Sequence, residues 1–108
     1  MAQIGFVVKQ EDGSYQGQLR TLSIKTVVRI APNENKQPDS NQPDYRIQSG
    51  GVEIGAGWIR TSESSGQKYV SLSFAAPEFG QRRLYANLGQ AAGQDDPDVY
   101  AIIWNPSD

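Results

Sequence analysis

The sequence predicts an all-β fold: a small antiparallel β-barrel or sandwich of about seven to eight strands, with little or no helix. Glycine and proline interrupt the chain at short intervals, and apolar and polar residues alternate between them with the period of a strand. The 108 residues, 37% of them hydrophobic, suffice for one modest core. We therefore expect a single domain over residues 1–108.

Eight segments have the character of strands. They cover residues 4–9, 15–22, 23–31, 44–48, 52–61, 68–74, 82–88 and 99–105. The Asp-Gly pair at 12–13 and the Ser-Gly-Gly run at 49–51 favour tight hairpins. Residues 76–80 are the best helix candidate, and they allow one turn at most.

The alternation also predicts which side chains form the core. We expect the inward-facing set to include Ile4, Phe6, Val8, Leu22, Ile24, Thr26, Val28, Ile30, Val52, Ile54, Ala56, Trp58, Val70, Leu72, Phe74, Leu84, Ala86 and Leu88. Gly55 and Gly57 lie inside a predicted strand and no helix follows them. We therefore expect them to permit bending or close packing, and not to form a phosphate loop.

A longer connection interrupts this pattern at residues 32–43. It contains three prolines and no large apolar side chain. We predict a flexible loop that the fold does not require, because it has no apolar group to bury and its prolines cannot extend a ladder. Loops of this length are either functional or simply disordered, and the sequence leaves both readings open.

The composition excludes most familiar enzyme classes. With no His and no Cys, the chain cannot build a Ser-His-Asp or Cys-His nucleophile, a zinc site with the usual ligands, or a disulfide. Asp44, Glu53 and Glu78 are the carboxylates nearest the predicted strands, but no spacing pairs them. The acidic run at 95–98 lacks the spacing of a calcium hand. We predict a non-enzymatic domain with no catalytic residue, cofactor or metal ligand.

The charge distribution argues against a protein that binds duplex DNA by bulk electrostatics, since the net charge is −2. Residues 1–31 hold four bases and two acids, and residues 44–88 hold five bases and four acids, so the predicted strands carry a slight basic excess. No apolar run approaches the length of a membrane span, and residues 1–8 have the pattern of a strand and not of a signal peptide. We expect a cytoplasmic protein without a membrane partner.

Several short motifs follow one another in a distinctive order. They are Asp12-Gly13-Ser14-Tyr15-Gln16-Gly17, Pro43-Asp44-Tyr45-Arg46, Glu53-Ile54-Gly55-Ala56-Gly57-Trp58, Tyr85-Ala86-Asn87-Leu88 and Ile103-Trp104. In this order the chain resembles the bacterial domain-of-unknown-function family 736 over nearly its whole length. The resemblance implies no known activity. It implies a small cytoplasmic protein encoded on plasmids and integrated conjugative elements.

Two positions depart from the pattern of that family. Ala75-Ala76-Pro77 stands where the pattern has Asp-Asp-Pro, so any carboxylate chemistry at that turn is missing here. Trp104-Asn105-Pro106 stands where a basic residue follows Trp-Ser, which removes a terminal basic contact.

Tyr69, Arg83 and Tyr85 form the predicted contact surface. Parity places them on the face opposite the core, and they would be neighbours if the sixth and seventh strands pair. Exposed Tyr and Arg often anchor protein interfaces, although they also serve as ordinary cross-strand partners.

We therefore favour an accessory or interaction protein of a mobile genetic element, with a protein partner. The alternative is a β-barrel that binds single-stranded nucleic acid, because Tyr and Arg also stack on bases and neutralise phosphates. The oligomeric state is left open.

Overall fold

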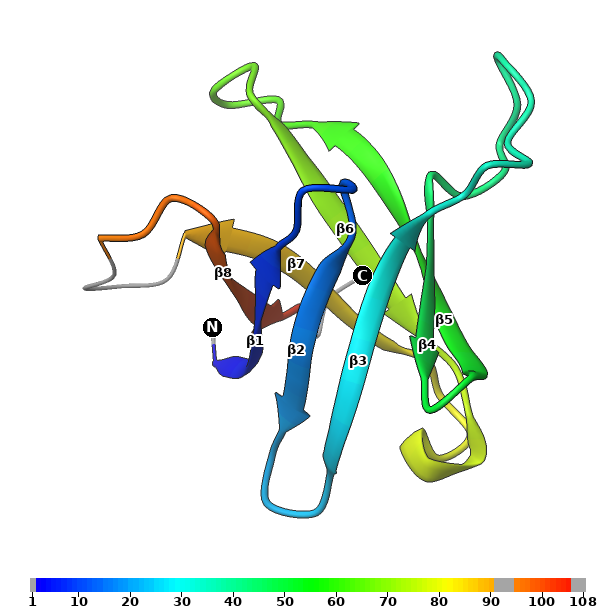
Figure 1. The fold of residues 1–108 in the computed structure, drawn as a ribbon, viewed down its shortest axis with the longest axis vertical. Coiled ribbons are helices and arrows are strands. Elements are labelled where there is room, and N and C mark those ends of the chain that lie inside the picture. Colours follow the sequence, from blue (N-terminus) through cyan, green and yellow to red (C-terminus); the bar gives the residue numbers. More distant parts are fainter. Residues whose placement is uncertain (1, 91–94, 106–108) are drawn as a thin grey trace.

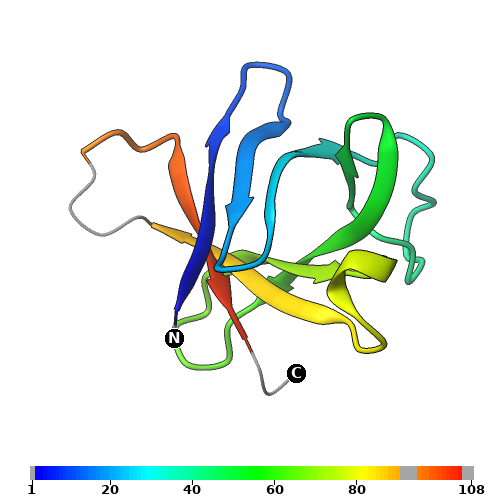
Figure 2. The same cartoon turned by 90° about the horizontal axis from the view of Figure 1, so that it is seen from below.

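The computed structural model describes residues 2–90 and 95–105, without the side chain of Glu78, and confirms the all-β prediction. Its strands are β1 (Gln3–Lys9), β2 (Tyr15–Arg20), β3 (Lys25–Pro32), β4 (Tyr45–Ser49), β5 (Val52–Thr61), β6 (Lys68–Phe74), β7 (Leu84–Gln90) and β8 (Val99–Trp104). Each strand pairs antiparallel with the next, and β8 pairs with β1 (Figures 1 and 2). The sheet is therefore a closed barrel and not a sandwich.

The connections alternate between the two ends of the barrel (Figure 1). The end that holds the β1–β2, β3–β4, β5–β6 and β7–β8 connections is called the upper end. The opposite end is called the lower end, and it holds the β2–β3, β4–β5 and β6–β7 connections. The last of these contains the 3-10 turn η1 (Pro77–Phe79), the single turn expected near 76–80.

The core is one cluster that fills the barrel. Its fully buried side chains include Val7, Leu19, Ile30, Ile47, Leu72, Phe74 and Ile102. Gly17 lies where β1 and β2 approach closely, because a Cβ there would overlap the carbonyl oxygen of Phe6. Gly55 plays the same part between β5 and β6, where a Cβ would overlap the carbonyl oxygen of Ser73. The expectation of close packing at Gly55 is confirmed.

The inner face of β1 differs from the predicted one. Ile4 is buried as expected, but Phe6 is 40% exposed and Val7, not Val8, is fully buried. The pairing of β1 with β8 shifts register between Gln3 and Gly5. Such an irregularity breaks the two-residue alternation, so a parity carried forward from Ile4 assigns the wrong face.

The same effect overturns the prediction that Trp58 belongs to the core. The β4–β5 register shifts between Ile47, which faces Gly55, and Gln48, which faces Glu53, so Ile54 is an extra residue on β5. Ile54 is buried, whereas Val52 is 64% exposed. Beyond the bulge Gly57 faces inward and Trp58 lies half-buried on the outer face.

A tight turn at 21–24 joins β2 to β3. Thr21 N–H donates to the carbonyl of Ile24 at 2.8 Å, and Ile24 N–H donates to Thr21 Oγ1 at 3.1 Å. Leu22 sits at the tip and is fully exposed, contrary to its predicted place in the core. The inward alternation of β3 begins instead at Ile24.

The two predicted hairpin turns are confirmed. Gly50 and Gly51 have φ values of 58° and 84°, the positive pair that a two-residue hairpin requires. In the β1–β2 turn, Asp12 accepts hydrogen bonds from the hydroxyl and the backbone N–H of Ser14, at 2.6 and 2.9 Å. These two bonds lower the pKa of Asp12 below its ordinary value, with a smaller contribution from Arg29.

The β3–β4 connection contains several hydrogen bonds of its own. Asn33 Nδ2 donates to the carbonyl of Pro43 at 2.9 Å, and Lys36 Nζ donates to that of Gln42 at 2.7 Å. Lys36 also forms an ion pair with Asp44 at 3.3 Å. The flexibility expected of residues 32–43 stays a prediction.

Candidate interaction surfaces

The structure brings two of the three predicted contact residues together. Arg83 immediately precedes β7, and Tyr85 pairs with Ser73 of β6. Tyr69 lies on the same outer face, but it pairs with Arg60 of β5. It is four residues from Ser73 along β6, a distance of about 13 Å in an extended strand. Arg83 is exposed and both tyrosines are half-buried. Tyr69 therefore lies apart from the other two, toward the upper end.

A shallow hollow of about 440 Å³ adjoins Arg83 and Tyr85 on the outer face of the barrel. We call it the outer hollow, and its lining comprises Pro43, Arg46, Glu53, Gly55, Ala56, Trp58, Ser73, Ala75 and Arg83. Small residues form its floor. Ser73 is buried in this floor, and Tyr85 lies beside it in register on β7; Ser71, two residues away along β6, is also buried and pairs with Trp58.

The 32–43 loop and Asp44 hold Trp58 at the rim of the outer hollow. Trp58 Nε1 donates to the carbonyl of Asn41 at 3.2 Å, and the N–H of the next residue, Ile59, donates to Asp44 Oδ2 at 2.8 Å. Sequence reasoning missed Trp58 as a surface residue because it continued the parity of Ile54 across the bulge. The loop and β5 thus position this aromatic side chain together.

The two arginines that line the outer hollow differ in whether their charge is already paired within the protein. Arg46 is paired with Glu53 at 2.9 Å, so its charge is already balanced. Arg83 forms no ion pair with any side chain that the structure describes. An exposed guanidinium in this state has its five donors available to a partner.

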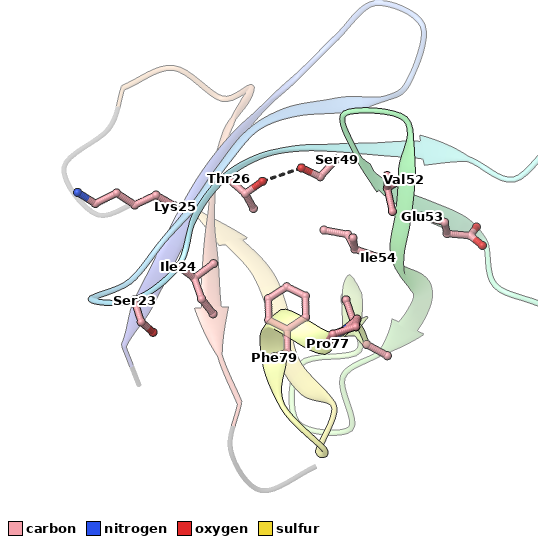
Figure 3. A pocket seen from close by; sticks show the side chains of 12 residues that line it. Ser23, Ile24, Lys25, Thr26, Ser49, Val52, Glu53, Ile54, Pro77 and Phe79 are labelled. Carbon is pink, nitrogen blue, oxygen red and sulfur yellow. Dashed lines mark hydrogen bonds between the residues drawn. The ribbon is translucent and has the colours of Figure 1, made fainter.

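A second cavity, about 490 Å³, opens at the lower end (Figure 3). We call it the lower pocket. Its apolar lining includes Ile24, Val52, Ile54, Ala76, Pro77 and Phe79. A hydrogen bond of 2.6 Å between the hydroxyls of Thr26 and Ser49 spans one side. The pocket combines residues from four separate segments, and no local motif in the sequence marks it.

Three tyrosines meet inside the upper end. The ring of Tyr15 lies 5.9 Å from that of Tyr45 and 5.4 Å from that of Tyr100, both edge to face. Burial raises the pKa of Tyr15 to about 12, with smaller contributions from Tyr45 and Tyr100. The Tyr15 phenol therefore stays neutral over the physiological range, and its contacts are those of a packed core.

The acidic run at 95–98 forms an exposed turn, in which Asp98 N–H donates to Asp96 Oδ1 at 2.9 Å. Within residues 2–90 and 95–105, no three side chains of the metal-binding types gather at one place. The same residues include no helix that is long and apolar enough to cross a membrane.

Comparison with protein families gives one match, to the family described as protein of unknown function (DUF736), over residues 3–107. The chain belongs to this family. Comparison with curated proteins gives no match, and neither does comparison with solved structures. In this DUF736 member, the Ala75-Ala76-Pro77 turn lies at the lower pocket, where it contributes apolar surface.

Proposed function

We propose that this protein is a non-enzymatic accessory protein of a bacterial mobile genetic element, and that it acts by binding another protein. The contact surface is the outer hollow together with Arg83 and Tyr85. One observation carries the proposal: Trp58 and Arg83 line a hollow whose floor is made of small residues, and Tyr85 lies beside Ser73 of that floor.

This arrangement has the features of an interface centre. Trp, Tyr and Arg are the residues that most often dominate the binding energy of protein interfaces, and they do so where a depression allows water to be excluded around them. The aromatic pair offers apolar area, and the free guanidinium of Arg83 offers directional donors. A partner that inserts one side chain above Ser73 would contact all three residues.

The cellular context and the lack of catalysis are part of the same proposal. The absence of His and Cys supports a non-enzymatic role, because most nucleophile and general-base pairs need one of them. The motifs shared with the family support an origin on plasmids and integrated conjugative elements and a place in the cytoplasm.

Single-stranded nucleic acid is the second candidate partner, and it has a specific observation in its favour. Seven basic side chains form no ion pair within the described part of the chain: Lys9, Arg20, Lys25, Arg60, Lys68, Arg82 and Arg83. Binding to phosphates would fall steeply with salt, by roughly 0.7 in log-log slope for each contact.

Affinity capture from the native host tests both candidates. Tagged wild-type protein, Tyr85→Ala and Arg83→Ala are compared with and without nuclease, and Tyr69→Ala serves as the matched control. We expect the first two substitutions to abolish capture of a specific protein, and Tyr69→Ala and nuclease to leave it unchanged. If nuclease treatment abolishes capture of the bound material, single-stranded nucleic acid would be the supported partner instead. Equal capture by all variants, each shown to be folded by circular dichroism, would refute the outer hollow as the contact surface.

A further inference from the structure

The two ends of the barrel carry opposite charge. The described connections at the upper end hold nine acids and one base, Lys36, and the strand ends beside them add the bases Lys9 and Lys68; the acids are Glu11, Asp12, Glu34, Asp39, Asp44, Glu63, Asp95, Asp96 and Asp98. At the lower end, Arg20 and Lys25 face each other across the β2–β3 hairpin, and Arg82 and Arg83 precede β7. The lower end therefore attracts anionic groups.

Bases outnumber acids at the lower end. Glu53, near the start of β5, is paired with Arg46, and Glu78 is the one acid in the sequence of the three lower connections. None of the four bases forms an ion pair with a side chain that the structure describes. An acidic partner is thus complementary to the field at this end.

The lower end of the barrel also has a strand edge without a ladder partner, where the contact with β4 that the structure gives is the 2.6 Å hydroxyl bond of Thr26 with Ser49. β3 pairs with β4 only over Arg29–Pro32, whereas its other neighbour, β2, pairs with it from Lys25 onward. The segment from Lys25 to Val28 therefore has no register partner on the β4 side. The lower pocket lies along this edge, and its lining includes Lys25 and Thr26 (Figure 3).

Apolar side chains surround the same edge. Leu22 at the β2–β3 turn is fully exposed, and Val27 and Val52 are 65% and 64% exposed. Inside the pocket, Ile24 and Phe79 are partly buried and pack against the core. Figure 3 shows Ile24, Ile54 and Phe79 pointing toward the cavity, while the Lys25 side chain extends away from it. An apolar group entering between β3 and η1 would be covered on three sides.

We propose that the lower pocket binds an extended peptide segment in which acidic and apolar residues alternate, and that this segment adds as a strand to β3 at Lys25–Val28. Alternate side chains of a strand point to opposite faces. The apolar ones would enter the pocket beside Ile54, and the acidic ones would lie on the outer face beside Lys25, with Arg20 on β2 one strand further away. Strand addition satisfies the backbone groups of an open edge and leaves specificity to the side-chain pockets. This site opens at the lower end, shares Glu53 and Ala75 with the outer hollow, and goes beyond the proposed function.

A fluorescein-labelled peptide, acetyl-Asp-Leu-Asp-Ile-Asp-amide, is the probe, and fluorescence anisotropy with the full chain is the measurement. We expect saturable binding by the wild-type protein. The double substitution Arg20→Glu and Lys25→Glu should weaken it by about tenfold or more, since both charges near the peptide are reversed. Lys68→Glu, an exposed lysine at the upper end, is the matched control and should bind as the wild type does.

Two altered peptides separate strand addition from simple charge attraction. N-methylation of every peptide amide removes the backbone donors, keeps the negative charges and should abolish binding, whereas Lys in place of every Asp should abolish binding through charge. Hydrogen exchange should show that the intact peptide protects Lys25–Val28. Tyr85→Ala should leave the affinity for the peptide unchanged, so failure here is distinct from failure of the outer hollow.

The proposal is overturned if the probe does not bind, if the N-methylated peptide binds equally well, or if the double substitution has no effect. Sedimentation of the protein alone gives a further check. A dimer that the Arg20→Glu and Lys25→Glu substitutions dissociate would assign the lower pocket to a second copy of the chain, and would also overturn it.

Discussion

At the scale of single residues, glycine decides how closely β1 and β2 approach. A methyl group at Gly17 would overlap the backbone of Phe6 and Val7, which cannot move without opening the ladder. We expect Gly17→Ala to lower the free energy of unfolding by about 1–3 kcal/mol through overpacking. Urea unfolding measures this, with Gln16→Ala on the exposed face of β2 as the control. A loss below about 0.5 kcal/mol would mean that the two strands separate more easily than their pairing indicates.

Because the Tyr15 phenol is buried, the free energy of unfolding should fall as the pH rises above 10. Its pKa is raised from 10.0 to about 12 in the folded state by burial, so the folded state holds this proton more tightly than the unfolded state does. The stabilisation is complete below pH 10 and is lost as the pH rises toward 12, by about 2–3 kcal/mol in total.

Unfolding by urea at a series of pH values, together with tyrosinate absorbance, measures this dependence. Tyr15→Phe should remove this part of the decline between pH 10 and 12, because the variant has no buried phenol at position 15 to lose a proton. An unchanged decline in that variant would assign the effect to other groups.

At the scale of elements, the 32–43 loop is expected to be dispensable for folding. Its hydrogen bonds are mostly internal, and the one to β5 comes from Trp58 Nε1. Replacing residues 34–42 with a short Gly-Ser linker should lower the free energy of unfolding by less than about 2 kcal/mol, a minor part of the stability of a typical domain. Thermal and urea unfolding test this. A larger loss would show that the loop packs on the barrel as part of the fold.

The bulge in β5 is the element that shapes the outer hollow. By inserting Ile54 as an extra residue it turns Gly55 and Gly57 inward and Trp58 outward. The inward glycines let β5 approach β6 and leave room for Leu72, so one local irregularity determines both the packing beneath the hollow and the aromatic residue at its rim.

At the scale of the whole molecule, closure by β8 holds the barrel together. β8 pairs with both β1 and β7 and buries Ile102 completely. We expect a chain that lacks residues 99–105 to lose cooperative unfolding, because two long strand edges and part of the core would be exposed. Circular dichroism during heating measures this, with the full chain as reference. A cooperative transition in the shortened chain would show that seven strands fold without closure.

The fold class could be predicted from the sequence because its determinants are local. Turn residues such as Gly50 and Gly51 set the hairpins through their own backbone preferences, and alternation over β6 and β7 identified Val70, Leu72, Phe74 and Ala86 as inward-facing. The same local alternation put Arg83 and Tyr85 on the outer face, which is where they lie.

Only the tertiary structure decided which strands close the barrel, where the two bulges fall and what the lower pocket contains. The bulges in β1 and β5 depend on how each strand pairs with its neighbour. Phe6 and Trp58 therefore lie on the outer face, although nothing in the sequence around them predicts it. The lower pocket joins Ile24, Ile54 and Phe79, which the sequence separates widely. Composition and alternation act within a few residues, whereas register and pocket shape arise from backbone pairing across the whole chain.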